Sequence, residues 1–229
     1  MKTPALHVSG ILFDLDGTLV DSAPDIANAA NNMLRSLGEE QATPEQIQTW
    51  IGNGLPKLVK RALTKDFDGE PDPALFEKAL KLQMHHYERD VCVDSYMYVG
   101  VAETLKALHE QGFTLGCVTN KDASCTLPLL NQLGIDHFFT SIVSGDTCNH
   151  KKPHPEPILF GIEEMGLKPE NCALVGDSAH DIHAAQAANI PAIAVNYGHN
   201  QGVDLSTQNP HALIESFADI LPLFTLNTE

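Results

Sequence analysis

Basic residues are scarce in this sequence. Its 229 residues include 14 lysines and arginines against 30 aspartates and glutamates, which gives a formal net charge of −16 at pH 7. A charge of this sign argues against nucleic acid or an anionic membrane as a partner, because both are negatively charged. An anionic substrate would need a local positive site, supplied by a metal ion or by well-placed lysines.

Paired cysteines, a signal-peptide pattern and long apolar runs are also missing. The five cysteines are odd in number and show no C-x-x-C spacing, which is typical of reduced thiols in a cytoplasmic protein. The N-terminus lacks a charged-then-apolar pattern, and no apolar run approaches membrane-spanning length. We therefore expect a cytoplasmic protein without a membrane partner. The eleven histidines show no convincing metal-ligand spacing.

A short apolar run followed by two aspartates is the most informative feature that the sequence does contain. Residues 8–13 read as a buried strand, and Gly17 and Thr18 interrupt it directly after Asp14 and Asp16. Side chains two apart on an extended chain share a face, so both carboxylates point into the same space. A divalent cation, a shared proton or both would relieve their repulsion, and one carboxylate could act as nucleophile or acid. The alternative is a pair of solvated loop aspartates.

The segment from residue 22 to residue 93 is predicted to be entirely helical. Helix starts are indicated at Ser22 with Asp25, at the capping box Thr43 to Gln46, and at Asp72 before a proline. From about residue 101, helices alternate with apolar strands that lack polar alternation, which indicates a parallel sheet covered on both faces. The predicted fold is α/β: a Rossmann-like doubly wound parallel core over 1–21 and 94–229, with a small all-helical domain, 22–93, inserted after the first strand.

Four polar clusters stand at the ends of predicted strands or just before a helix. They are Asp14 with Asp16, Thr119–Asn120–Lys121, Lys151–Lys152–Pro153–His154–Pro155, and Gly176–Asp177–Ser178–Ala179–His180–Asp181. Ligands of doubly wound sheets bind beyond the carboxyl ends of the strands, so the four clusters are expected to converge there. Each has a plainer alternative: Thr119 and Asn120 as a helix cap, Lys152 as a solvated lysine, and Asp177 with Ser178 as another cap.

The order of these clusters, D-x-D-G-T, strand-Thr-Asn, Lys-Pro and G-D-S-x-x-D, resembles the motif set of the haloacid dehalogenase superfamily with a helical cap after the first motif. The resemblance implies that Asp14 is a nucleophile forming an aspartyl-phosphate, and that Asp16 is the general acid and base. It implies that Thr119, the Asn120 amide and Lys152 hold the phosphoryl oxygens. Mg²⁺ would be bound by the Asp14 carboxylate, the Asp16 carbonyl and Asp177, with Asp181 and Ser178 as outer groups.

Within the helical segment, the stretch from Thr49 to Gly54 and the following Arg61 are similar to the cap loop of bacterial phosphoglycolate phosphatases. Backbone amides of Gly52, Asn53 and Gly54 could approach a small carboxylate closely, and Arg61 could pair with it. The alternative is an ordinary glycine-containing turn, with Arg61 on a wet surface.

The expected activity is Mg²⁺-dependent hydrolysis of a small organic phosphate, with 2-phosphoglycolate giving glycolate and phosphate as the first candidate. Another phosphatase of this branch, acting on a sugar phosphate or pyrophosphate, is an open alternative. A sugar-phosphate mutase like β-phosphoglucomutase is a second alternative, and a non-catalytic binding protein is a third. The expected assembly is a monomer or homodimer.

Overall fold

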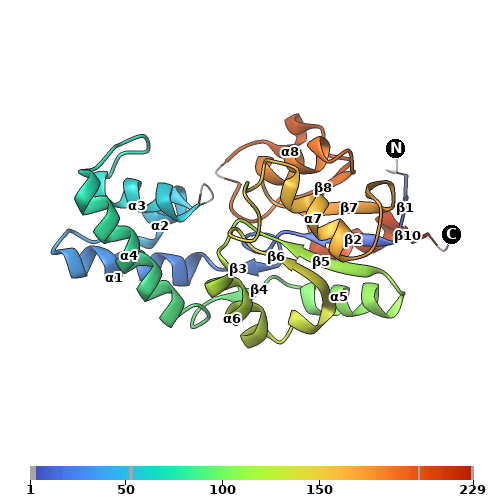
Figure 1. Cartoon of the computed structure of the whole chain (residues 1–229), viewed down its shortest axis with the longest axis horizontal. Helices are drawn as coiled ribbons and strands as arrows, with labels where there is room; N and C mark the ends of the chain where they lie inside the picture. Colours follow the sequence, from blue (N-terminus) through green and yellow to red (C-terminus); the bar gives the residue numbers. More distant parts are fainter. Residues whose placement is uncertain (1–3, 52–53, 201, 228–229) are drawn as a thin grey trace. The chain divides into compact units, whose positions relative to one another are not determined.

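The computed structural model describes residues 4–51, 54–200 and 202–227. The chain forms two compact units, one made of Met1–Asp21 with Met97–Glu229 and the other of Ser22–Tyr96 (Figure 1). The first unit alternates strands and helices, whereas the second is built from helices. We call them the core unit and the helical unit. The segment predicted to be helical, 22–93, lies within the second.

A six-stranded parallel sheet forms the centre of the core unit. In chain order its strands are β2 (Gly10–Phe13), β5 (Thr114–Val118), β6 (Phe139–Val143), β7 (Cys172–Gly176), β8 (Ala192–Val195) and β9 (Ala212–Ile214). Their spatial order is β6-β5-β2-β7-β8-β9, and every neighbouring pair is parallel. Counted along the chain this order is 3-2-1-4-5-6, so the sheet is doubly wound as predicted and changes direction between β2 and β7.

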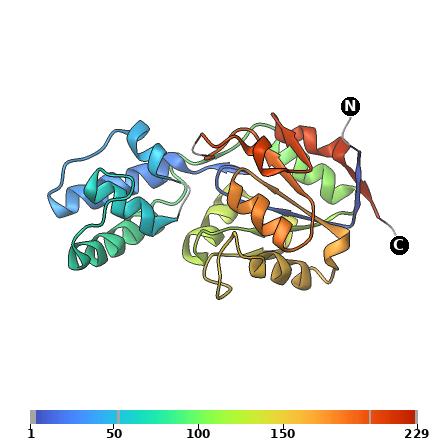
Figure 2. The ribbon, with the colours of Figure 1, turned by 90° about the horizontal axis from the view of Figure 1, so that it is seen from above.

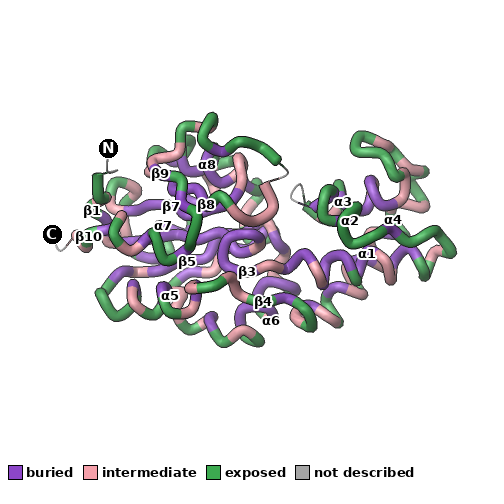
Figure 3. The backbone as a smooth tube through the Cα atoms, turned by 180° about the vertical axis from the view of Figure 1, so that it is seen from behind, coloured by how far each residue is buried: buried purple, intermediate pink, exposed green. Residues whose placement is uncertain are grey.

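Both faces of the sheet are covered, because successive side chains of a strand point to opposite faces. On β2, Leu12 belongs to a buried cluster with Ile158 and Ile182, which lie on two helices of one face. The next residue, Phe13, points the other way and contacts Phe217, with ring centroids 5.7 Å apart. The central strands are consequently buried along most of their length (Figure 3).

Four helices flank this sheet: α5 (Val101–Glu110), α6 (Ala123–Leu133), α7 (Glu156–Glu164) and α8 (Ala179–Ala187). Helices α7 and α8 lie on one side of it and α5 on the other (Figure 2). The described residues of the core unit also form four short 3₁₀ helices: η1 (Asp136–Phe138), η2 (Pro169–Asn171), η3 (Leu205–Gln208) and η4 (Phe217–Leu223).

The first apolar run is two strands and not one. Strand β1 (Leu6–Val8) pairs in parallel with β10 (Phe224–Leu226), whereas β2 joins the central sheet. Ser9 lies between them: its N–H donates to the carbonyl of Asn171, and its hydroxyl donates to the carbonyl of Asn227. These contacts turn the chain from one sheet into the other. Strands β3 (Val20–Asp21) and β4 (Tyr96–Met97) form a further two-stranded sheet.

The helical unit contains α1 (Ala23–Leu37), α2 (Pro44–Trp50), α3 (Leu55–Thr64) and α4 (Pro73–Arg89). Its helix ends largely follow the predicted signals: Thr43 forms a capping box with Gln46, and Asp72 accepts a hydrogen bond from the amide of Leu75. Helix α1 ends at Gly38, whose φ of 77° is left-handed and suits glycine. Among the described residues, no helix is long and apolar enough to cross a membrane.

The predicted start of α1 is confirmed, because Ser22 is the residue that precedes the helix, although its side chain makes no cap hydrogen bond. Asp25 is buried and accepts hydrogen bonds from the amides of Val93, Asp94 and Ser95 and from the Ser95 hydroxyl. The carboxylate therefore ties α1 to the segment that follows α4. All five cysteines are free, in agreement with the sequence prediction.

Candidate active site

The polar segments predicted to converge do so beyond the ends of the three central strands. Asp14 directly follows β2, Thr119 follows β5 and Asp177 follows β7, and these strands are immediate neighbours in the sheet. The amide of Asp14 donates to the carbonyl of Val175 at 2.9 Å, which holds the first aspartate against the end of β7. The site thus lies at the switch point of the sheet.

Lys152 occupies the middle of this group. Its ammonium lies 2.7 Å from Oδ1 of Asp14 and 2.6 Å from Oδ1 of Asp181, and it donates to the carbonyl of Val118 at 2.7 Å. Only 2% of its side chain is exposed, so the solvated-lysine alternative does not apply. Three acceptors saturate the three donors of the ammonium.

Asn120 holds the backbone of Lys152. Its side-chain amide donates to the Lys152 carbonyl at 3.0 Å, and its Oδ1 accepts from the Lys152 amide at 2.9 Å. Thr119 is 3% exposed, and its hydroxyl accepts a hydrogen bond from the amide of Lys121. The segment after β5 therefore positions the loop between β6 and α7, which carries Lys152.

Asp177 and Asp181 are both buried, and each is held by main-chain donors. Oδ2 of Asp177 accepts from the amide of His199 at 2.7 Å, and Oδ1 accepts from the Thr18 hydroxyl at 3.2 Å. Oδ2 of Asp181 accepts from the amide and hydroxyl of Ser178, at 3.1 and 2.5 Å. Ser178 is therefore a helix cap as well as a neighbour of the carboxylates.

Two glycines allow the loops to approach Asp177 this closely. Gly17 has a φ of +87°, and a Cβ there would lie 2.1 Å from Oδ2 of Asp177. Gly198 has a φ of +93°, and a Cβ there would lie 2.7 Å from the same oxygen. Any side chain at either position would collide with the carboxylate.

Asp16 has a different partner from Asp14, and sequence reasoning missed it. The ammonium of Lys121 donates to both carboxylate oxygens of Asp16, at 2.8 and 3.0 Å, and its side chain is only 4% exposed. The Asp16 side chain is 22% exposed, against 12% for Asp14. The position of Lys121 directly after Thr119–Asn120 is the signal that could have identified it.

His199 is a second missed neighbour of the site. Its ring lies 3.4 Å from Oδ1 of Asp21 through Nε2. Burial alone would lower the pKa of this imidazole, but the nearby carboxylate of Asp21 and the charges of Asp177 and Asp16 raise the pKa above its usual value. His199 is therefore a basic group beside the aspartates.

The pKa shifts of the carboxylates reflect burial and crowding of like charges. Burial and the charges of Asp181 and Asp177 raise the pKa of Asp14 well above its usual value, although Lys152 opposes this. Burial and the charge of Asp181 raise the pKa of Asp177 to about 6. Burial would lower the pKa of Lys152, but Asp14 and Asp181 raise it, so the ammonium stays charged.

The same crowding makes the group suited to a divalent cation. Oxygen atoms of Asp14, Asp177 and Asp181 all lie within 4.8 Å of one another. When ionised, these three carboxylates and Lys152 carry a net charge of −2, which a divalent cation would neutralise. Donors that are all carboxylate oxygens favour Mg²⁺ over softer metals. The residues present therefore fit the predicted metal.

The structure describes only part of the predicted cap loop. Gly52 and Asn53 lie outside the described residues, and Gly54 precedes α3 with a φ of 82°. Arg61 is 3% exposed: its Nε donates to the carbonyl of Phe67, its Nη1 donates to that of Trp50, and its guanidinium stacks 3.5 Å from the Phe67 ring centroid. Arg61 thus braces the interior of the helical unit, which differs from both roles considered from the sequence.

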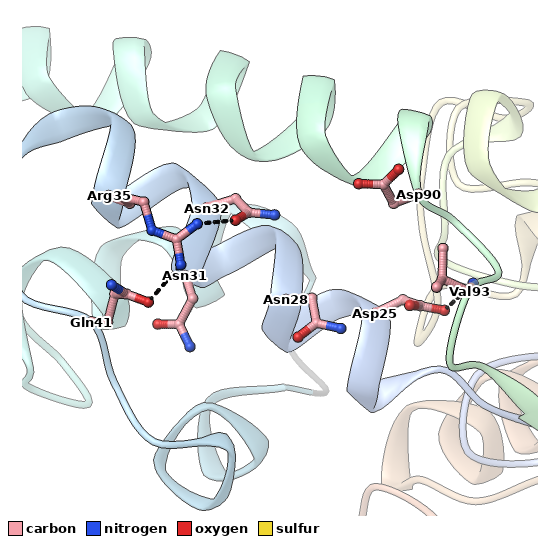
Figure 4. Close-up of a pocket in the computed structure, with 8 residues that line it drawn as sticks. All are labelled: Asp25, Asn28, Asn31, Asn32, Arg35, Gln41, Asp90 and Val93. Carbon is pink, nitrogen blue, oxygen red and sulfur yellow. Dashed lines mark hydrogen bonds between the residues drawn. The ribbon is translucent and has the colours of Figure 1, made fainter.

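The helical unit also contains a polar pocket of about 400 Å³ (Figure 4). Several side chains that line the pocket bind one another or the backbone. Arg35 donates to the side-chain oxygens of Asn32 and Gln41, and Asn31 exchanges two hydrogen bonds with the backbone of Ala42. These contacts hold the loop after α1.

A second set of potential metal ligands lies on the loop before α7. His150, His154 and Glu156 each offer an atom within 4.8 Å of the others. The sequence shows no convincing metal-ligand spacing among the histidines, yet the loop brings His150 and His154 together. A four-residue spacing brings two side chains together in a helix, but these two residues lie on a loop.

Comparison with known proteins agrees with this geometry. Residues 11–195 match the family model described as haloacid dehalogenase-like hydrolase. A phosphoglycolate phosphatase of Nitrosococcus oceani is 41% identical over 94% of this chain and 96% of its own, and one of Nitrosospira multiformis is 44% identical over 95% and 96%. The crystal structure of a predicted phosphoglycolate phosphatase from Haemophilus somnus is similar with a TM-score of 0.87 and 36% identity, covering 94% of this chain and 97% of that one. Motifs, fold and site geometry agree, and the chain belongs to the haloacid dehalogenase-like hydrolase family.

Proposed function

We propose that this protein is a Mg²⁺-dependent phosphomonoester hydrolase that acts through an aspartyl-phosphate on Asp14, with 2-phosphoglycolate as its substrate. The observation that carries the proposal is the buried group of Asp14, Asp177, Asp181 and Lys152. Its excess of negative charge is one that a divalent cation would neutralise. Nearly full-length relatives named phosphoglycolate phosphatase, at 41% and 44% identity, support this choice of substrate.

Phosphoryl transfer depends mainly on positioning and on neutralising the charge of the transferred group. Asp14 would attack phosphorus through the carboxylate oxygen that Lys152 does not contact. The Lys152 ammonium and the Thr119 hydroxyl would bind phosphoryl oxygens, together with the backbone amide of Asn120. A bound Mg²⁺, held by Asp14, Asp177 and the carbonyl of Asp16, would neutralise negative charge on the phosphoryl group.

Asp16 is the proposed proton carrier. It would give a proton to the oxygen of the departing alcohol and later take one from the water that cleaves the aspartyl-phosphate. Of the two motif aspartates its side chain is the more exposed, which suits a group that must meet both alcohol and water. The contact with Lys121 would keep its carboxylate turned toward the same place in both steps.

The helical unit would act as a cap that excludes water during the first step. The stretch Gly52, Asn53 and Gly54 remains the proposed reader of the substrate carboxylate. Arg61 is better explained as support for the helical unit, since carbonyls of that unit already accept its hydrogen bonds.

The test is phosphate release from 2-phosphoglycolate, a sugar phosphate and pyrophosphate at equal concentration, with Mg²⁺ and with a chelator. The proposal predicts Mg²⁺-dependent release with a strong preference for 2-phosphoglycolate. Release centred on either of the other compounds would keep the hydrolase and overturn the substrate. Conversion of a sugar phosphate to its isomer with little free phosphate would favour the mutase alternative.

A further inference from the structure

His150, His154 and Glu156 form a compact cluster on the surface of the core unit. The imidazole rings of the two histidines are stacked, with centroids 4.1 Å apart and planes inclined by 21°. Glu156 is the first residue of α7, and its Oε2 lies 2.6 Å from Nδ1 of His150. All three side chains come from one stretch of seven residues and can therefore close around a common point.

Hydrogen bonds orient the side chains of the cluster. Nδ1 of His154 accepts a hydrogen bond from the amide of Glu156 at 3.1 Å, which fixes the orientation of this ring and leaves Nε2 as the nitrogen that can face a metal ion. Oε2 of Glu156 and Nδ1 of His150 already face each other at 2.6 Å, and a metal cation could take the place of their hydrogen bond.

We propose that His150, His154 and Glu156 bind a divalent transition-metal ion of the zinc class. Two imidazole nitrogens and one carboxylate oxygen are a ligand set that zinc uses, with bonds of about 2.0 to 2.2 Å, and water would complete the tetrahedron. Ligand atoms within 4.8 Å of one another need only small side-chain rotations to reach such bonds. His150 is exposed and Glu156 is part-buried, so both have room to rotate.

This site is distinct from the carboxylate group around Asp14. That group offers oxygen atoms only and suits Mg²⁺, whereas imidazole nitrogen favours zinc, copper or nickel. The nearest lysine along the loop, Lys151, has its ammonium engaged by Asp122 at 2.9 Å and by the carbonyl of Asn120 at 3.2 Å. The Lys151 ammonium is therefore held by these two partners and not by the side chains of the cluster.

Calorimetric titration with Zn²⁺ tests the proposal. Asp177→Asn in the full chain provides the background, because it weakens the carboxylate group as a competing site. Into this background we place His150→Ala or, as a matched control, His109→Ala, which also removes one exposed imidazole from the core unit. The expected result is that His150→Ala binds one equivalent of Zn²⁺ fewer than the background, while His109→Ala binds as the background does. Equal stoichiometry in all three proteins would overturn the proposal.

X-ray absorption at the zinc edge provides a second readout on the unsubstituted chain with excess Mg²⁺ present. The proposal predicts outer-shell scattering from two imidazole rings for the first equivalent of Zn²⁺, from at most one ring in His150→Ala, and at least about tenfold weaker binding in Glu156→Gln. A spectrum with oxygen ligands alone would contradict the proposal. Neither readout depends on the phosphatase activity, so the proposed function and this site can fail separately.

Discussion

Two buried lysines hold the two motif aspartates. Lys152 contacts Asp14 and Asp181, and Lys121 contacts both oxygens of Asp16. Each ammonium neutralises a carboxylate and restricts its rotation. The entropy lost by this restriction is small, because the site is already ordered. The distinct partners of Asp14 and Asp16 suit two carboxylates with different tasks in one reaction.

Replacing Lys121 tests whether the orientation of Asp16 matters. Lys121→Met should lower kcat about 10²-fold while KM changes little, because a misplaced proton carrier affects the chemical step more than binding. Steady-state kinetics on 2-phosphoglycolate would measure this. Lys151→Met is the matched control: this lysine is 48% exposed and should be replaceable with little effect. Equal kcat values for the two variants would remove Lys121 from the machinery.

The pKa of Asp177 predicts how metal binding depends on pH. Burial and the charge of Asp181 raise this pKa to about 6 in the metal-free protein, so the folded protein binds a proton there more tightly than the unfolded chain does. Mg²⁺ must displace that proton, and its apparent affinity should therefore fall by up to about tenfold per pH unit below 6. Calorimetric titrations with Mg²⁺ between about pH 5 and pH 8 check this. An affinity unchanged over that range would contradict the assignment of Asp177 as a ligand.

The same raised pKa gives the opposite trend for stability. The metal-free folded state holds the extra proton only while the pH is between the unfolded and folded pKa values. The contribution of Asp177 to stability should then be lost as the pH rises from about 4 to about 6. Mg²⁺ would remove this loss by neutralising the carboxylate.

At the scale of elements, the strand ends determine where the chemistry lies. Asp14, Thr119 and Asp177 each occupy the position after a strand, and the three strands are adjacent, so no long loop is needed to assemble them. Helices α7 and α8 then bring in Lys152 and Asp181, one from the loop before its helix and one from the first turn. The site is thereby built on rigid elements.

Inside the helical unit, Asp25 connects α1 to the segment that follows α4. Asp25→Ala would leave three backbone amides and one hydroxyl without their acceptor, and should lower stability by about 3 kcal/mol. Asp72→Ala is a useful comparison, because Asp72 also stands at a helix start but accepts one amide, and its loss should cost about 1 kcal/mol. Hydrogen exchange of the amides of α1 and α4 would report both changes. Equal losses would show that the contacts of Asp25 add nothing beyond a cap.

The elements also show how far sequence reasoning reaches. Strands with continuous apolar residues, and helices ending at Gly38 or beginning at Thr43, were predictable because the signals are local. Strand β9 was not, because its three residues carry too short a pattern. The contacts of Asp25 and Arg61 were also beyond prediction, since the partners of a polar side chain depend on distant segments.

At the scale of the whole molecule, the net charge of −16 makes cations the natural partners of the site. An anionic substrate approaches against this field, so the local positive charge of Lys152, Lys121 and the proposed Mg²⁺ must overcome it. The proposed Mg²⁺ is therefore expected to raise the affinity for the substrate, and the substrate to raise the affinity for Mg²⁺.

Mg²⁺ binding should raise the stability of the folded protein by mass action. At a Mg²⁺ concentration about 100 times its Kd the gain is about 2.7 kcal/mol. Thermal unfolding with and without Mg²⁺ would measure it, and a chelator should abolish both the gain and the activity. Asp177→Asn should unfold at the same temperature in both conditions. If Asp177→Asn kept the full Mg²⁺-induced rise in unfolding temperature, the metal would have to bind elsewhere.

The turnover of Asp14→Asn on 2-phosphoglycolate with Mg²⁺ is the most direct test of the central claim that Asp14 is the nucleophile. The substitution keeps the size of the side chain and removes the charged oxygen that attacks phosphorus. A loss of at least about 10³-fold in kcat is predicted, with the far-ultraviolet circular dichroism and folded fraction of the unsubstituted protein retained. Turnover within about tenfold of the unsubstituted enzyme would contradict the account, because the aspartyl-phosphate could not then lie on Asp14.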